Sequence, residues 1–351
     1  MNILQILKTF LIAAVGGLLF QLLHLPLPCM LGPLTVTIFY HTISHGKAVW
    51  PVQLRNAGLI VIGYSMGRTV TPETAGQILA NLPAMFGVTL LTMSFCVAVG
   101  YFTHRRTGIS FSSGMLGSIP GGLAQMVLLT EEIKDADVTV VTFLQMMRVL
   151  TVVFCVPFIA DGIGPMPAAA AAPLVAAGAL GWTAALPAIV AALLGAGLAN
   201  LLKLPIPTLL GPIFATAAAV LMGQEAPRVP PLVMNTALIF FGTYFGIIIT
   251  FDSIRKLGRV FPYAIGGGAA ILAFTFLVAY GLTFVVPATM LTSFLSTAPG
   301  GLSEVGVVAL SLHADVAFIM AYQLFRLFSI LLLLPPLIRW WFRRSHVRKS
   351  C

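Results

Sequence analysis

The sequence contains very little charge. Asp, Glu, Lys and Arg together make up 8% of its 351 residues, whereas 59% are hydrophobic. A soluble domain carries roughly 25% charged residues, so this chain has too little polar surface for a water-soluble fold. The composition predicts a polytopic integral membrane protein. The net charge of +9 does not indicate a nucleic-acid partner, because the basic residues cluster at the ends of apolar segments, as in the positive-inside pattern.

Motifs for catalysis or metal binding are missing as well. None of the four cysteines forms a C-x-x-C pair, and the six histidines form no ligand cluster, so neither a disulfide framework nor a metal site is predicted. Phosphate-binding loops, nucleotide fingerprints and catalytic triads are also absent from the sequence. We therefore expect no enzyme, no metal and no cofactor. Active transport would have to draw on a H⁺ or Na⁺ gradient or on a partner protein.

The chain repeats itself. Residues 25–33 (LPLPCMLGP) match residues 204–212 (LPIPTLLGP), an offset of 179 residues. After one deletion the offset becomes 178, and it relates Arg148 to Arg326. Landmarks that stay in register over this length indicate an internal duplication.

Each half contains six apolar segments. They cover 3–23, 28–43, 54–71, 80–103, 110–131 and 137–159 in the first half and 180–202, 207–222, 232–250, 261–286, 289–311 and 315–338 in the second. The chain divides accordingly into a first membrane repeat (1–161), a linker (162–173), a second membrane repeat (174–339) and a basic, cytoplasmic tail (340–351).

The fifth segment of each half carries a Pro-Gly-Gly sequence, at residues 120–122 and 299–301. Proline followed by two glycines cannot continue a helix. In a bilayer, the backbone groups that such a break frees must be buried in protein or line a wet cavity. Interrupted segments at corresponding positions of two halves point to a transport site.

The basic loops determine the predicted topology. His104–Arg106 and Asp252–Arg259 lie on the same side of the membrane only if each half crosses it an odd number of times. Six segments give five crossings when the Pro-Gly-Gly segment enters and leaves on one side. We therefore predict an all-α protein of two inverted-topology repeats, each with about five transmembrane helices plus a Pro-Gly-Gly re-entrant or broken helix. Both termini are predicted to be cytoplasmic.

Two arginines lie inside apolar segments. Arg148 and Arg326 occupy equivalent places in the last segment of each half, and Gln145 and Gln323 precede them by three residues, which puts amide and guanidinium on one helix face. A charge near the midplane must face the bundle interior or water. The arginines therefore either frame an anion site or tie down the backbone carbonyls of the broken helices. The sequence leaves both interpretations open.

Backbone and carboxylate groups complete the predicted site. Gly121, Gly122, Gly300 and Gly301 are expected to offer N–H groups to a substrate anion at a half-helix N-terminus. Glu304, where the first half has Gln125, is a candidate for coupling to H⁺ or Na⁺, although the helix dipole alone would also favour a carboxylate there. Asn56 and Asn235 are weaker coupling candidates. Asp137 and Asp315 are interpreted as helix N-caps.

The duplicated L-P-x-P-x-x-L-G-P and P-G-G-L elements, with Q-x-x-R in the last segment of each half, resemble the bacterial membrane AbrB family. Members carry two copies of one hydrophobic domain, and the resemblance covers nearly the whole chain. This family is distinct from the small soluble DNA-binding regulator of the same name. Members are labelled as regulators of gene expression or as ammonia monooxygenases, but the sequence contains neither a DNA-binding module nor a ligand cluster for copper or iron.

Three functions are compatible with these observations. The first is a secondary transporter or exporter in the bacterial inner membrane, which moves a small anionic solute by alternating access at the repeat interface. The alternative is a membrane-embedded sensor or regulator of gene expression that binds a ligand without transporting it. An intramembrane oxidase is the third, and it lacks metal ligands. A homodimer is the default expectation for closed symmetry.

Overall fold

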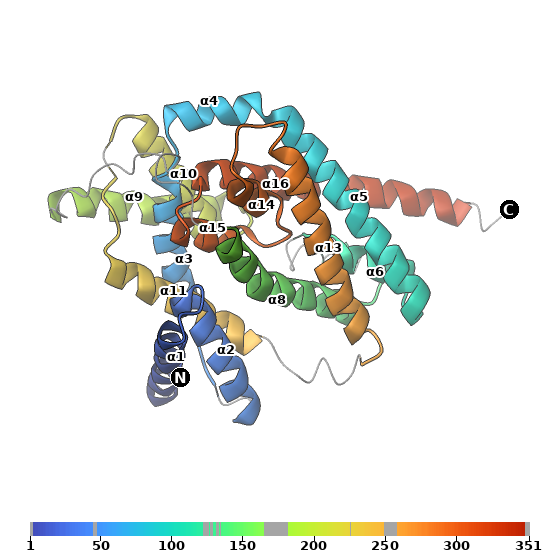
Figure 1. The fold of residues 1–351 in the computed structure, drawn as a ribbon, viewed down its shortest axis with the longest axis horizontal. Coiled ribbons are helices and arrows are strands. Elements are labelled where there is room, and N and C mark those ends of the chain that lie inside the picture. The colour runs from blue at the N-terminus through green and yellow to red at the C-terminus, as the bar shows by residue number, and fades with distance from the viewer. Residues whose placement is uncertain are drawn as a thin grey trace. The chain divides into compact units, whose positions relative to one another are not determined.

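The protein is described by a computed structural model, which covers residues 3–44, 48–121, 126, 129–130, 133, 135–164, 182–224, 226–248 and 258–347. Within these ranges the chain forms helices and no strand (Figure 1). The helices are α1 (Ile3–Leu22), α2 (Pro28–Ile43), α3 (Val52–Gly67), α4 (Pro72–Ala80), α5 (Leu82–Thr107), α6 (Phe111–Ser118), α8 (Val138–Ile163), α9 (Trp182–Leu201), α10 (Pro207–Leu221), α11 (Pro231–Ile248), α13 (Phe261–Leu282), α14 (Met290–Thr297), α15 (Leu302–Ser311) and α16 (Val316–Val347).

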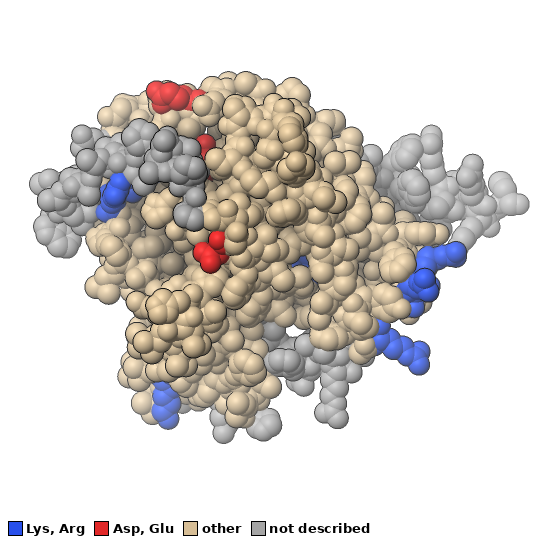
Figure 2. Space-filling view, in the orientation of Figure 1, with Lys and Arg blue, Asp and Glu red and all other residues tan. Residues whose placement is uncertain are grey.

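Five of the described helices, α1, α5, α8, α11 and α13, are long and apolar enough to cross a membrane. Helix α1 leaves Leu4, Leu11 and Leu18 exposed along one face, as a lipid-facing helix does. Most of the described surface drawn in Figure 2 is uncharged. The prediction of an all-α, multi-pass membrane protein is therefore confirmed.

Two helices, α4 and α16, differ most from the predicted segments. Helix α4 was not predicted, because its nine residues, PETAGQILA, have neither the length nor the apolar content of a span. Helix α16 continues to Val347, into the predicted tail, because no proline or glycine follows Pro336 to end it. Most of the predicted linker and the loop 249–257 lie outside the described residues.

The L-P-x-P motifs begin α2 and α10 in the same way. Leu27 and Ile206 take left-handed backbone conformations, with φ of 51° and 48°, and the proline that follows each is the first helical residue. Proline suits that position because its missing N–H would have no partner there and its fixed φ is already helical. One repeated motif therefore produces the same bend in both halves.

The described residues group into two compact units, and each unit contains helices from both sequence halves. Unit 1 comprises Met1–Ile78, Phe154–Lys256 and Ser303–Phe318, and unit 2 comprises Leu79–Val153, Leu257–Leu302 and Ile319–Cys351. The units therefore do not coincide with the two repeats. Unit 1 holds α1 to α3, α9 to α11 and nearly all of α15, and unit 2 holds α5, α6, α13 and α14.

In unit 1, helices pack closely at glycines. A Cβ at Gly32 would meet the backbone of Gly16, and a Cβ at Gly211 would meet the backbone of Gly195, so α2 lies directly on α1 and α10 directly on α9. These two contacts are related by the offset of 179 residues found in the sequence. Small residues allow helix backbones in a membrane to approach in this way.

Helices α3 and α11 of unit 1 occupy equivalent positions in the two halves and run antiparallel. Gly58 lies against the carbonyl of Ala237, which is its own equivalent. Earlier in α3 than Gly58, the Arg55 guanidinium lies 4.6 Å from the centre of the Tyr244 ring. Later in α3 than Gly58, the Tyr64 hydroxyl donates to the Pro227 carbonyl at 2.8 Å. Residues later in α3 thus meet residues earlier in the α11 region, as antiparallel neighbours do.

Unit 2 shows the same relation between α5 and α13. Phe95 stacks on its equivalent, Phe274, with ring centres 4.0 Å apart and planes 5° apart. Phe102, near the end of α5, lies 6.4 Å from Tyr263, near the start of α13. The two helices are therefore antiparallel. The basic end of α5, His104–Arg106, consequently lies beside the start of α13, which Arg259 precedes in the chain.

Candidate functional site

Helices α6 and α14 end immediately before the two Pro-Gly-Gly sequences. Helix α6 ends at Ser118 and is followed by Ile119 in an extended conformation, and α14 ends at Thr297 and is followed by extended Ala298. After the second break the chain resumes as α15. The sequence predicted that a helix ends just before each of these prolines, because proline lacks the N–H that would continue the helical ladder.

Two side chains of α8 bind the carbonyl end of α6. The Gln145 amide donates to the carbonyls of Leu116 and Ile119, at 2.7 and 2.9 Å. The Arg148 guanidinium donates to the carbonyls of Ser118 and Ile119, at 3.4 and 2.8 Å. The last carbonyls of a helix have no intrahelical donor. Gln145 and Arg148 supply donors to this end of α6.

Two side chains of α16 likewise bind the carbonyl end of α14. The Gln323 amide donates to the carbonyls of Leu295 and Ala298, at 2.9 and 3.2 Å. The Arg326 guanidinium donates to three carbonyls and to the Gln323 side-chain oxygen. Its carbonyl partners are Thr297 at 3.3 Å, Ala298 at 2.8 Å and Gly300 at 2.9 Å. The Q-x-x-R motif therefore has the same local role in both halves.

The two arginines are buried cations close to one another. Arg148 is 5% exposed and Arg326 is 6% exposed. Arg148 belongs to α8 and Arg326 to α16, and both lie in unit 2. The hydrogen-bond acceptors of Arg326 among the described residues are uncharged carbonyls. A buried cation costs free energy unless it is paired or hydrogen-bonded, so neutral acceptors satisfy its hydrogen bonds without cancelling its charge.

The structure thus shows the carbonyl contacts that one interpretation of the arginines predicted. Binding of a substrate by Arg148, Arg326, Gln145 and Gln323 stays a prediction. Gly121 and Gly300 lie at the two breaks, each half-buried, and Gly301 follows Gly300 just before α15. Gly122 and Gln125 lie outside the described residues.

A hydrogen bond joins the start of α6 to the start of α8. The Ser113 hydroxyl accepts from the Asp137 backbone N–H at 2.8 Å. The chain between these residues contains the first Pro-Gly-Gly sequence, so it returns after the break to the place where it began. The Asp137 carboxylate in turn accepts from the backbone N–H groups of Thr139 and Val140, at 2.7 and 3.3 Å.

Asp137 is therefore the N-cap of α8, and Asp315 caps α16 by accepting from the Phe318 N–H at 3.0 Å. Replacing Asp137 by alanine is expected to lower the free energy of unfolding by about 1 kcal/mol, because the first N–H groups of α8 lose their acceptor. Titration of the purified protein with sodium dodecyl sulfate, followed by circular dichroism, measures this change. Asp135→Ala, at an exposed neighbouring position, should change the stability by less than about 0.5 kcal/mol.

Three candidates for ion coupling, Glu304, Asn56 and Asn235, belong to unit 1, whereas the two arginines belong to unit 2. Glu304 is 6% exposed and lies in the first turn of α15. Asn56 accepts hydrogen bonds from the Arg55 guanidinium at 2.8 and 3.2 Å. Asn235 lies at the wall of a pocket. The structure places Arg148 and Arg326 in one unit and both asparagines in the other.

A small cavity lies beside Arg148 in unit 2. Its volume is about 10 Å³, and Arg148, Thr103, Ser118 and Tyr263 contribute to its wall. One water molecule needs roughly 10–15 Å³, so this space holds no more than a water-sized group.

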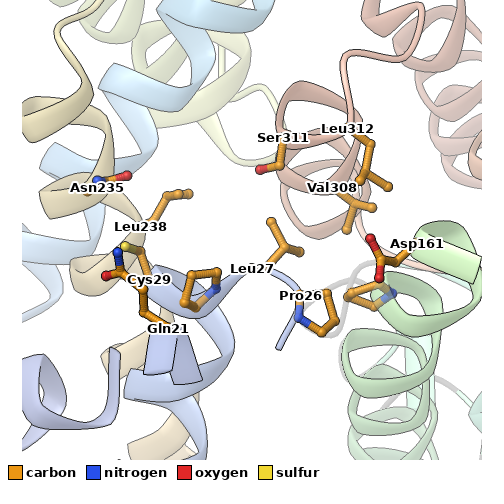
Figure 3. A pocket seen from close by; sticks show the side chains of 12 residues that line it. Gln21, Pro26, Leu27, Cys29, Asp161, Asn235, Leu238, Val308, Ser311 and Leu312 are labelled. Atoms are coloured by element: carbon orange, nitrogen blue, oxygen red, sulfur yellow. The ribbon is translucent and has the colours of Figure 1, made fainter. Parts of the chain in front are cut away.

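A larger pocket of about 350 Å³ lies entirely in unit 1 (Figure 3). The first L-P-x-P motif contributes Pro26, Leu27 and Pro28 to its lining, and Asp161 at the end of α8 forms part of its wall. This pocket was not predicted from the sequence. The repeated motif and an acidic residue at the end of a predicted span were the available signals.

Among the described residues, no group of three or more His, Cys, Asp or Glu side chains has the geometry of a metal site.

Comparison with known proteins gives one family and two relatives. The model of the family described as "Transition state regulatory protein AbrB" matches residues 30–342. A protein of Escherichia coli (strain K12) named "Putative regulator AbrB" is 29% identical over 337 residues, which cover 91% of this chain and 91% of that protein. "Uncharacterized protein YhjN" of Bacillus subtilis (strain 168) is 25% identical over 361 residues, which cover 96% of this chain and 93% of that protein.

Proposed function

The chain belongs to the membrane AbrB family, and we propose that it is a non-enzymatic secondary transporter of a small anionic solute in the bacterial inner membrane. The observation that carries this proposal is the buried Arg326 guanidinium, which donates to uncharged acceptors and lies in the same unit as a second buried arginine, Arg148. Two cations held together in a low-dielectric environment repel one another. An anion bound between the two helix breaks would relieve this repulsion.

The rigid contacts around the arginines also favour a binding site. The guanidinium groups are held by carbonyls at 2.8 to 3.4 Å and by the flanking helices, so their positions are defined before a ligand arrives. A preorganised site loses less side-chain entropy on binding. Non-helical backbone at membrane depth is tolerated where it is buried or lines a wet cavity, and both breaks in this protein fall beside an arginine.

Inverted topology of the two repeats is supported by the helix directions. Helix α3 is antiparallel to its equivalent α11, and α5 is antiparallel to its equivalent α13. Two copies inserted in the same orientation would have parallel equivalents. The proximity of Phe102 to Tyr263 also supports a common side for His104–Arg106 and Arg259. Transporters with inverted repeats alternate access by moving one bundle against another around a fixed site.

The Ser113–Asp137 hydrogen bond supports a re-entrant first Pro-Gly-Gly segment and leads to a labelling prediction. In a variant whose native cysteines are replaced, cysteines introduced at Ile109 and at Asp135 should react with a membrane-impermeant maleimide from the same side of sealed vesicles. A cysteine at Asp161, one span further on, should react from the opposite side. Reaction of the Ile109 and Asp135 positions from opposite sides would contradict the re-entrant segment.

Transport is tested with the protein in proteoliposomes on a solid-supported membrane. Concentration jumps of chloride, inorganic phosphate, acetate and succinate at constant cation concentration should produce currents with at least one of these anions. Empty liposomes provide the control. Repeating the jumps at several pH values and with Na⁺ replaced by K⁺ tests the coupling role proposed for Glu304, because a coupled current depends on the driving ion.

A sensor or regulator that binds its ligand without transport is the second candidate, and the name of the Escherichia coli relative favours it. The same experiment separates the two functions. A sensor would be stabilised by one of the anions in a thermal unfolding assay, because a ligand that binds only the folded state raises its stability. It would produce no current in the solid-supported membrane.

A further inference from the structure

The pocket of unit 1 is lined by residues other than the two arginines and needs its own explanation. Its volume is about 350 Å³, within the range of roughly 300–1,000 Å³ in which proteins bind small organic ligands. A single metal ion or water molecule would leave most of this space empty. The size therefore indicates an organic ligand.

The charge of the wall is negative. Asp161 contributes a carboxylate to the pocket (Figure 3), and its lining residues, all within the described part of the chain, include no Lys, Arg or His. The second sequence half has Arg339 at the position equivalent to Asp161, so the duplicated architecture does not itself require an acidic residue there.

Helix ends add to this charge. Gln21, Asp161 and Ser311 line the pocket from the last turns of α1, α8 and α15. A helix C-terminus carries a partial negative charge of about half a unit. Helix α2 begins at the pocket, and the partial positive charge of its N-terminus offsets part of this negative charge. The full charge of Asp161 nevertheless makes the net charge of the wall negative.

The rest of the wall combines polar and apolar groups. The Asn235 and Gln21 amides approach from α11 and α1, while Leu27, Leu238 and Val308 supply apolar surface (Figure 3). A carboxylate, further acceptors and apolar surface together match an alkylammonium group.

We propose that this pocket binds a small organic cation, with its ammonium group beside Asp161 and its alkyl part against the leucines. This site takes a ligand of opposite charge to the solute of the arginine site. It does not depend on the transport proposal, because it rests on residues of unit 1 alone.

Cys29 lines the pocket and allows a direct test in detergent-solubilised protein. In a Cys155→Ser/Cys351→Ser background, Cys29 is labelled with trimethylammonioethyl methanethiosulfonate or with sulfonatoethyl methanethiosulfonate, and intact mass spectrometry gives the rates. Cys96 is fully buried and is retained, and a variant that also carries Cys29→Ser gives the background. After normalisation to the rates with free mercaptoethanol, the cationic reagent should react with Cys29 at least about tenfold faster than the anionic reagent. Tenfold is the lower end of the enrichment that charge-lined clefts produce.

Asp161→Asn should remove most of this preference, whereas Asp135→Asn, an exposed aspartate in unit 2, should leave it unchanged. As a second measurement, tetraethylammonium chloride should slow labelling of Cys29 by neutral methyl methanethiosulfonate, and sodium chloride at the same ionic strength should not. Equal normalised rates for the two charged reagents, an equal loss of preference in both aspartate variants, or no protection by tetraethylammonium would each overturn the proposal.

Discussion

Replacing Arg326 by alanine is expected to abolish the anion current and to destabilise the protein. The carbonyls of Thr297 and Gly300 would lose the Arg326 donor, and a buried acceptor left unsatisfied costs about 1–3 kcal/mol. The free energy of unfolding should therefore fall by about 2–6 kcal/mol. Thermal unfolding and detergent titration measure the loss of stability, and the current per folded molecule measures the loss of function.

Two further variants separate the structural role of Arg326 from anion binding. Arg326→Lys keeps a positive charge but loses the planar fork that reaches several carbonyls at once, so it should fold better than the alanine variant and keep part of the current. Arg106→Ala removes an exposed arginine and should change neither the free energy of unfolding nor the anion current. A folded Arg326→Ala protein with the wild-type current would contradict the proposed anion site.

Replacing Gly211 by alanine is expected to have the second large effect. The added Cβ would overlap with the backbone of Gly195, so α10 would have to move away from α9. Overpacking of this kind costs about 1–3 kcal/mol where side chains can adjust and more where backbone blocks the space. We expect a loss of at least about 3 kcal/mol in the free energy of unfolding, measured by detergent titration.

The same helix pair offers a matched control. A Cβ added at Gly197 in α9 would meet no atom within 4 Å, so Gly197→Ala should be neutral or stabilise the helix by up to about 1 kcal/mol. Gly32→Ala makes the equivalent change in the first half, against Gly16, and should cost as much as Gly211→Ala. Equal stability of the Gly211 and Gly197 variants would show that the close helix contact is not required.

The helices and their interruptions were largely predictable from local sequence. Apolar segments predicted α1, α2, α9 and α10 to within two residues at each end, because a membrane span must be continuous, apolar and helical. Pro120 and Pro299 predicted the ends of α6 and α14, since the loss of a backbone donor is a local effect. The amphipathic helix α4 was missed because it is too short to give a membrane signal.

The sequence by itself determined the membrane class, the repeated motifs and the offset that relates Arg148 to Arg326, because composition and register depend only on the order of residues. Which groups the arginines bind was decided by the tertiary structure. A guanidinium accepts any oxygen of suitable geometry as a partner, and only packing of α16 against α14 brings the Thr297 and Gly300 carbonyls within reach. The pocket at Asp161 likewise required the folded chain, since its wall combines residues of α1, α8, α11 and α15, whose proximity no sequence spacing expresses.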